Sequence, residues 1–202
     1  TGADLKGADL TRGKTIMRFE IINRFNYWHI FSGEGDSLCE VVERAVRQGV
    51  NLAEANLMGA DLRGADLAHA RMFNAYLYSA DLTGAVLDRA DLAGAKISKA
   101  DLTGAKMQGA NLSEANLHRA ILVGADLTGA NLEKADLIGA RLGNAKLVGA
   151  KLKAAFLTRA DLTGADLKGA DLTRAEMILT KGLQLDEWPA AESSAGVYSG
   201  LY

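Results

Sequence analysis

Apolar positions recur every five residues along most of the chain. From Ala55 to Ala175 every fifth residue is alanine, which gives 25 alanines in register. Two residues after each alanine stands Leu, Met or Ile, from Leu57 to Met177. Counting the unit that begins at Val50, 26 five-residue units follow one another without an insertion. Each unit therefore has two apolar positions and three positions that are mostly polar or glycine.

A period of five fits neither a helix nor a flat strand. A five-residue step on an α-helix advances by about 140° net, so the leucines would scatter around the axis. On a strand the same step alternates between the two faces. One buried face results if the chain turns a corner after every unit, so that four units close a coil of 20 residues. Coils of this kind stack about 4.8 Å apart, as neighbouring strands do.

The residues between the apolar positions suit such corners. Glycine commonly stands two residues after the leucine, as at Gly59, Gly64 and Gly84, and glycine relaxes the backbone where a corner must close. Asp or Asn commonly precedes the leucine and can hydrogen-bond to the local backbone of a turn. The pattern therefore predicts a four-sided coil with alanine and leucine inside.

This unit resembles that of the pentapeptide-repeat family: a small residue, Asp or Asn, Leu or Phe, a polar residue and Gly. Residues 60–64 (Ala-Asp-Leu-Arg-Gly) and 125–129 (Ala-Asp-Leu-Thr-Gly) match at every position, and the resemblance covers about two thirds of the chain. It implies an all-β solenoid, a right-handed quadrilateral β-helix of pentapeptide repeats over residues 50–179. We expect about 6.5 coils, or about 31 Å of rod at sheet spacing.

Residues 17–49 are expected to form a small α+β cap over the first coil, because a bare coil would expose backbone and leucine. Alternation over residues 17–22 predicts one strand, and residues 27–31 predict a second, with a turn at residues 23–26. A hairpin and helix of this kind loosely resemble the leaders of phage and bacterial pentapeptide-repeat proteins.

A helix is predicted over residues 37–48. Ser37 and Glu40 fit a capping box, and Gly49 stands where the helix should stop. The side chains expected to face the first coil share one apolar side of this helix: Leu38, Val41, Val42, Ala45 and Val46.

The two end segments depart from the repeat. Residues 1–12 are identical to residues 163–174, yet Ala3 lies 52 residues before Ala55 and is out of register. Residues 1–16 are therefore of uncertain status: a duplication, a non-native stretch or a strand that pairs elsewhere. In residues 180–202 we expect a short cap around Trp188 and Pro189, followed by a tail at 193–202 that is either mobile or adhesive.

Composition narrows the class of protein. The net charge of -2 gives no reason to expect direct nucleic-acid binding. No run of 18 apolar residues and no apolar signal segment is present, so neither a membrane span nor secretion is expected. Cys39 is the single cysteine, and nothing points to an oxidising compartment. We expect a cytoplasmic protein.

No catalytic, metal-binding or cofactor-binding residues are predicted. Gly13-Lys14-Thr15 does not complete a phosphate loop, because that motif needs a glycine five residues before Gly13 and position 8 is alanine. His69 and His118 fall on different sides of the expected coil and cannot share a metal. A rod whose axis is filled by leucine offers no dry, concave pocket, which an enzyme usually needs. The sequence therefore predicts a protein that is not an enzyme and needs no cofactor.

Two outward surfaces are candidates for binding. Asp61, Asp81 and Asp101 stack along one side, with Asp161 further along; the alternative is that they only serve their turns. A second face combines aromatic and basic residues, which suits a contact patch; the alternative is isolated substitutions on a tolerant surface. This aromatic and basic face comprises Tyr76, Tyr78, Lys96, Lys99, His118, Arg119, Phe156 and Arg159.

Two classes of function follow. The first is a non-catalytic, rigid scaffold that presents side chains to an unidentified protein partner, with end-to-end self-association included. The second is implied by the resemblance: a DNA mimic that binds a type II topoisomerase, as an inhibitor or protector of DNA gyrase. Mimicry needs strong negative charge, whereas residues 50–179 contain 15 Asp and Glu against 15 Lys and Arg. We therefore favour the scaffold.

Overall fold

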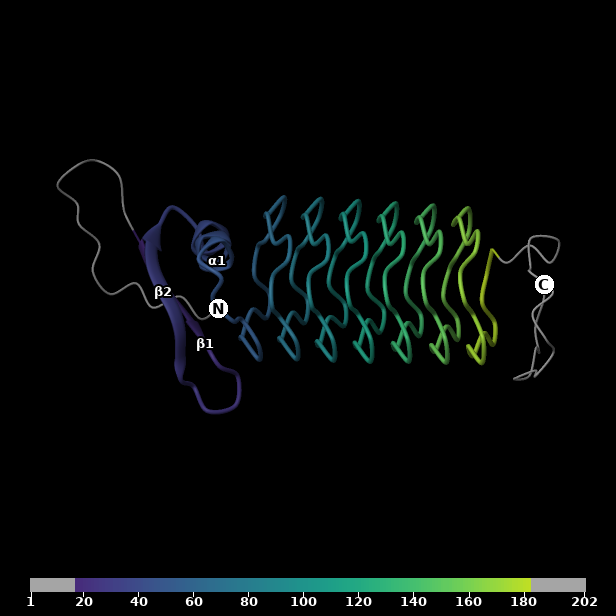
Figure 1. The fold of residues 1–202 in the computed structure, drawn as a ribbon, viewed down its shortest axis with the longest axis horizontal. Helices are drawn as coiled ribbons and strands as arrows, with labels where there is room; N and C mark the ends of the chain where they lie inside the picture. Colours follow the sequence, from purple (N-terminus) through teal and green to yellow (C-terminus); the bar gives the residue numbers. More distant parts are fainter. Residues whose placement is uncertain (1–16, 183–202) are drawn as a thin grey trace.

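The structure is a computed structural model that describes residues 17–182. The repeat-like segment at residues 1–16, with its Gly13-Lys14-Thr15 motif, lies outside the described residues. So do residues 183–202, on which the expected C-terminal cap and tail fall. Within residues 17–182 the chain forms a row of stacked coils with a hairpin and a helix at one end (Figure 1).

The stacked coils take 20 residues each. Parallel bridges join every residue that precedes an inward Leu, Met or Ile to the residue 20 positions further on, from Asn51 with Arg71 to Asp161 with Lys181. Four five-residue units therefore complete one coil, as the period predicted. The result is the β-helix that the repeat indicated.

Hydrogen bonds between coils repeat with the same period. At one unit, the Leu82 N–H donates to the Asp101 carbonyl (2.7 Å) and the Gly84 N–H donates to the Thr103 carbonyl (2.9 Å). The Asp81 N–H donates in the opposite direction along the rod, to the Ala60 carbonyl at 2.9 Å. Most polar backbone groups inside the array thus find partners in the neighbouring coils, which is the condition for burying them.

Each corner is a β-turn closed within the unit. The Ala85 N–H, for example, donates to the Leu82 carbonyl at 2.9 Å. The third residue of the turn has a positive φ, as a type II turn requires. Gly84 takes this position with φ 67°, and Lys99 takes it in another corner with φ 58°. Corners can therefore carry long side chains, which then project from the edges of the rod.

The core is one continuous column of alanine and leucine. The inward residues from Leu52 to Leu162 are at most 6% exposed, so the inward assignment made from the period is confirmed. In the last described coil Ala170 and Ala175 are 6% exposed, whereas four inward residues are only half-buried: Ala165, Leu167, Leu172 and Met177.

The hairpin consists of β1 (Met17–Ile22) and β2 (His29–Gly35), paired antiparallel. The strand predicted over residues 17–22 is confirmed as β1, in which Phe19 and Ile21 are buried against the core. The second strand begins at His29, two residues later than expected, and continues to Gly35. The cause is the turn: the Asn23 side-chain oxygen accepts the N–H groups of Phe25 and Asn26, and Tyr27 has φ 58°.

Helix α1 (Leu38–Arg47) begins and ends close to the expected positions. The Ser37 hydroxyl accepts the Glu40 N–H at 3.2 Å, but the Glu40 carboxylate returns to the Asp36 N–H rather than to Ser37. At the other end Gly49 has φ 69°, and the Gly49 and Val50 N–H groups donate to the carbonyls of Val46 and Ala45. These two bonds form a Schellman motif, which satisfies the last carbonyls of the helix.

Hairpin and helix together cover the first coil. The Asn56 N–H donates to the Ile22 carbonyl at 2.9 Å, and the Asp66 N–H donates to the Glu43 carboxylate at 2.8 Å. Val41, Val42 and Ala45 are buried in the same cluster as the leucines of the coils. The hairpin and helix therefore accept hydrogen bonds from backbone N–H groups of the first coil. They also cover apolar side chains that this coil would otherwise expose.

Candidate interaction surfaces

The four-sided coil sorts the outward residues onto four sides. We call acidic side the residues 61–64 and those that follow at steps of 20 up to 161–164. We call basic-aromatic side the residues 56–59 and those that follow at steps of 20 up to 176–179. Both definitions follow the observed pairing of residues 20 apart. The two sides are neighbours, because they are consecutive units of each coil.

The structure stacks the acidic candidates as expected. Asp61 pairs with Asp81, and Asp81 pairs with Asp101, whereas Ile121 and Arg141 separate Asp101 from Asp161. Like charges in adjacent rungs lie about 4.8 Å apart and repel one another unless they are solvated or bonded. The negative charge that the acidic side presents to solvent therefore depends on the hydrogen-bond and ion-pair partners of these carboxylates.

Turn groups engage most of these carboxylates. Each of Asp81, Asp101 and Asp161 accepts two bonds on one oxygen, from the N–H and from the hydroxyl of the threonine two residues later; the hydroxyl distance is 2.6 Å in all three. These bonds lower the pKa of Asp161. The aspartates therefore hold the turns together whatever else they do.

Arg63 pairs with Asp61, the first carboxylate of the acidic side. Its Nε and Nη2 donate to the two carboxylate oxygens of Asp61 at 2.8 and 2.6 Å, and its Nε lies 3.6 Å from an oxygen of Asp81. The hydrogen bonds from Arg63 hold the pKa of Asp61 at about 2. The negative charge of Asp61, at the start of the acidic side, is therefore offset by Arg63.

The basic-aromatic side gathers the predicted aromatic and basic residues. Tyr76, Lys96 and Phe156 belong to one column of bridged residues, and Lys99, Arg119 and Arg159 project from the corner of the same side. The side carries four basic residues against two acidic residues, Asp136 and Glu176, for a net charge of 4 − 2 = +2. It also carries His118.

Most of the exposed large apolar side chains of the array are on this side. Met58, Tyr78, Phe156 and Leu179 are between 37% and 48% exposed, whereas Phe73 is the comparable residue on another side. The Lys99 ammonium lies 5.4 Å from the centre of the Tyr78 ring. Hydrogen bonding to Lys99 lowers the pKa of Tyr78. Tyr78 and Lys99 thus form one contact across two coils.

The predicted residues form a stripe and not one cluster. Phe156 and Arg159 follow Tyr76 and Ser79 by 80 residues, which is four coils or about 19 Å along the rod. A partner must therefore be long, or must use one half of the stripe at a time.

The hairpin turn extends this stripe, and the sequence did not indicate it. The Phe25 ring meets the Tyr76 ring edge-on at 5.6 Å, and the Arg24 guanidinium lies 5.8 Å from the centre of the same ring. Tyr27 and Trp28 are 66% and 74% exposed. The sequence predicts a strand from Tyr27, whereas in the structure Tyr27 and Trp28 precede β2, and the Asn26 side-chain oxygen accepts the Trp28 N–H at 3.0 Å.

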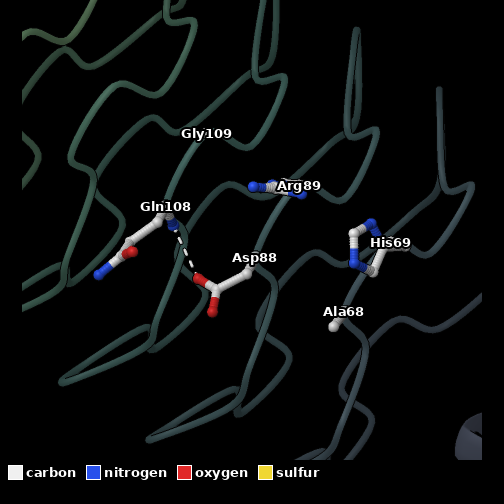
Figure 2. A pocket seen from close by; sticks show the side chains of 6 residues that line it. All are labelled: Ala68, His69, Asp88, Arg89, Gln108 and Gly109. Atoms are coloured by element: carbon white, nitrogen blue, oxygen red, sulfur yellow. Dashed lines mark hydrogen bonds between the residues drawn. The ribbon is translucent and has the colours of Figure 1, made fainter.

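A shallow hollow lies on the side opposite the basic-aromatic side. It has a volume of about 420 Å³ and is lined by Ala68, His69, Asp88, Arg89, Gln108 and Gly109. The Gln108 N–H donates to the Asp88 carboxylate at 2.8 Å (Figure 2). His69 lies far from His118, which belongs to the basic-aromatic side, so these two histidines are not brought together.

Nothing in residues 17–182 forms a group of three or more His, Cys, Asp or Glu side chains that could hold a metal ion. Cys39 lies half-buried in α1, and burial is the main cause that raises the pKa of its thiol. Across the described part of the chain, no helix has the length and apolar character needed to cross a membrane.

The fold and its surfaces define a β-helical solenoid of five-residue units. A family profile described as "Pentapeptide repeats" matches residues 48–77, 70–109, 110–147 and 140–177, with 8 copies. The chain belongs to the pentapeptide-repeat family.

Several solved structures are similar to this chain. HetL from the cyanobacterium Nostoc sp. strain PCC 7120, a pentapeptide repeat protein involved in heterocyst differentiation regulation, is 32% identical over 66% of this chain and 80% of HetL, with a TM-score of 0.38. Rfr23 from the cyanobacterium Cyanothece 51142 is 42% identical over 50% and 62%, with a TM-score of 0.35. QnrB1, a plasmid-mediated fluoroquinolone resistance protein, is 20% identical over 64% and 71%, with a TM-score of 0.40. No curated protein sequence matches the chain.

Proposed function

We propose that the protein is a non-catalytic interaction module that binds a protein partner through its basic-aromatic side. The observation that carries this proposal is the coincidence of exposed apolar side chains and net positive charge on that one side of the rod. In this proposal residues 17–49 cap the rod, and residues 50–179 present the binding surface. The single cysteine fits a reducing compartment, so we place this function in the cytoplasm.

The physical support is the composition and rigidity of the surface. Tyrosine and arginine are among the residues that contribute most to protein interfaces, and Arg119, Arg159 and Tyr78 all project from this side. Each projects from a backbone that is hydrogen-bonded to the coils before or after it. Little backbone entropy is therefore lost on binding, which favours affinity.

The proposal is tested by reversing charge on the binding side. A variant with Lys99→Glu and Arg119→Glu and the unchanged protein are each used to capture partners from the host, and the captured proteins are compared by quantitative mass spectrometry. We expect the partner to be lost from the variant. The matched control is Lys106→Glu with Lys168→Glu, which changes the net charge equally on the opposite side; equal loss from both variants would contradict the proposal.

A DNA mimic that binds a type II topoisomerase is the second candidate, favoured by the stacking of Asp61, Asp81 and Asp101 in successive coils. The rod has no net charge over residues 50–179, and Arg63 bonds to Asp61. We therefore expect no inhibition in a DNA gyrase supercoiling assay. Salt-sensitive inhibition that disappears when these three aspartates become asparagine would establish mimicry in place of the scaffold.

The asparagine variant is suited to this test because it should keep the fold. Asparagine already occupies the same position of the unit at Asn111, where its side-chain oxygen accepts the Ser113 N–H and hydroxyl. A loss of inhibition would then report the loss of charge and not the loss of a turn.

A further inference from the structure

The basic-aromatic side has an ordered arrangement of groups from the C-terminal end of the rod toward the hairpin. Phe156 and Leu179 are exposed at the C-terminal end. Basic groups follow, first Arg159 and Arg119 and then Lys99. Two carboxylates interrupt the series: Glu176 pairs with Phe156 at the C-terminal end, and Asp136 lies in the coil between Arg159 and Arg119. Exposed or half-buried apolar groups close the series at the hairpin end: Tyr78, Tyr76, Met58 and Phe25.

The sequence of residues 183–202, outside the described part of the chain, has the complementary order. Apolar residues come first, namely Leu183, Leu185 and Trp188. Three acidic residues, Asp186, Glu187 and Glu192, fall among and after them, and the segment contains no Lys or Arg, so its side chains carry a charge of -3. Further apolar residues come last: Val197, Tyr198, Leu201 and Tyr202.

The distances allow these two series to meet. Tyr78 lies five coils before Ile178, or about 24 Å along the rod at sheet spacing. Twenty residues in extended conformation span up to about 66 Å, which is enough to turn from Gly182 onto the basic-aromatic side and to reach Tyr78. Six residues after Gly182, at about 20 Å of extended chain, Trp188 comes within reach of Phe156.

We propose that residues 183–202 bind along the basic-aromatic side of the same chain, with Trp188 near Phe156, the acidic residues near Arg159, Arg119 and Lys99, and the final tyrosines near Tyr78. Attachment at Gly182, at the C-terminal end of the rod, fixes the direction of the segment, and the apolar contacts and charge pairing hold it along the side. This inference concerns the surface of the proposed function and rests on it in one respect: a protein partner must displace the segment before it binds.

The test places a photo-crosslinking residue, p-benzoylphenylalanine, at Tyr78 in the full chain. The matched control carries it at Phe73, which is 39% exposed against 37% for Tyr78 and lies on another side. Trypsin releases residues 182–202 as a single peptide, because no Lys or Arg follows Lys181, and it releases residues 72–89, which contain both crosslinker positions, as another. We expect the two peptides to be joined from position 78 and not from position 73.

Charge dependence separates docking from chance proximity. Replacing the three acidic residues by their amides (Asp186→Asn, Glu187→Gln and Glu192→Gln) should lower the crosslink yield from position 78 by roughly fivefold or more. A salt concentration of about 1 M NaCl, in which charges are screened over about 3 Å, should have the same effect. A mixture of ¹⁵N-labelled and unlabelled protein decides the source of the segment. We expect each crosslinked pair of peptides to be either fully labelled or fully unlabelled. Pairs that join a labelled to an unlabelled peptide would assign the segment to a second copy and overturn the proposal.

Other outcomes are equally decisive. Absent crosslinks to residues 182–202, or equal yields from positions 73 and 78, would reject the docked segment. If the same crosslinker joins a host protein but never the segment, the proposed function stands and this inference fails. If the segment is joined and no partner binds either the unchanged protein or the amide variant, the inference stands and the proposed function fails.

Discussion

The corner residue of each unit has a positive φ, and the chain places glycine, polar and charged residues there, and also Ala154 and Leu179, with similar backbone geometry. Gly84 has φ 67°, and Arg119 has φ 55°. A side chain in this conformation costs of the order of 1 kcal/mol relative to glycine. That cost is small beside the burial of one leucine per unit, about 2 kcal/mol. The inward positions therefore hold the fold, and the corner positions are free to vary for binding.

A carboxylate at an inward position should unfold the array locally, whereas the same carboxylate one residue earlier should not. Leu117 is fully buried, so Leu117→Asp places an unpaired charge in the core and should cost about 3 kcal/mol or more. Asn116→Asp points outward and should change the free energy of unfolding by less than about 1 kcal/mol. Urea denaturation measures both, and similar midpoints for the two variants would refute the inward assignment.

Arg63 should control the ionisation of Asp61. The pKa of Asp61 is lowered to about 2 by hydrogen bonds from Arg63, below its ordinary value of about 3.9. The stabilisation from this pair is therefore complete above about pH 4 and is lost as the pH falls through about 2. Arg63→Ala should raise the pKa of Asp61 toward its ordinary value in a carboxyl ¹³C NMR titration. Arg159→Ala, on the neighbouring side, serves as the control and should leave that titration unchanged.

At the scale of elements, α1 and the hairpin act as the missing neighbour of the first coil. Inside the array the N–H of the residue before each inward Leu, Met or Ile donates to an alanine carbonyl of the preceding coil. In the first coil, Ile22 and the Glu43 side chain replace that alanine for Asn56 and Asp66. An edge whose donors are occupied in this way is protected from pairing with another chain.

Glu43 should therefore contribute more to stability than its exposed ion pair with Arg47 suggests. Glu43→Ala removes the acceptor of the Asp66 N–H and should cost about 1 kcal/mol, and Glu43→Gln should recover part of it. Arg47→Ala removes only the ion pair, whose N–O distance is 3.5 Å, and should cost less than about 0.5 kcal/mol. Amide hydrogen exchange at Asp66 should rise in Glu43→Ala alone; an equal rise in Arg47→Ala would contradict the capping role.

At the scale of the whole molecule, the array was predictable because its signal repeats. Each unit indicates the same inward residues, so the coil length of 20 residues and the buried column follow from the sequence. The contacts of the ends were not predictable in this way. The Phe25 ring on Tyr76 and the Glu43 bond to Asp66 join residues 51 and 23 positions apart, and each occurs once. The charge of the acidic column also depended on one side chain, Arg63, whose direction no periodicity indicates.

Stacked coils contact only their neighbours, so the rod should open from its less protected end. The first coil is covered by α1 and the hairpin, and Leu52 and Leu57 are at most 1% exposed. In the last described coil Leu167, Leu172 and Met177 are half-buried. Within residues 142–160, amides such as those of Leu142, Asn144 and Leu147 donate to carbonyls of this coil. We expect the amides of residues 142–160 to exchange faster than those of residues 62–80 in native-state hydrogen exchange read by mass spectrometry. Leu172→Ala should widen the difference and leave residues 62–80 unchanged, because their neighbours are intact. Uniform exchange along the rod would show instead that the array unfolds as one cooperative unit.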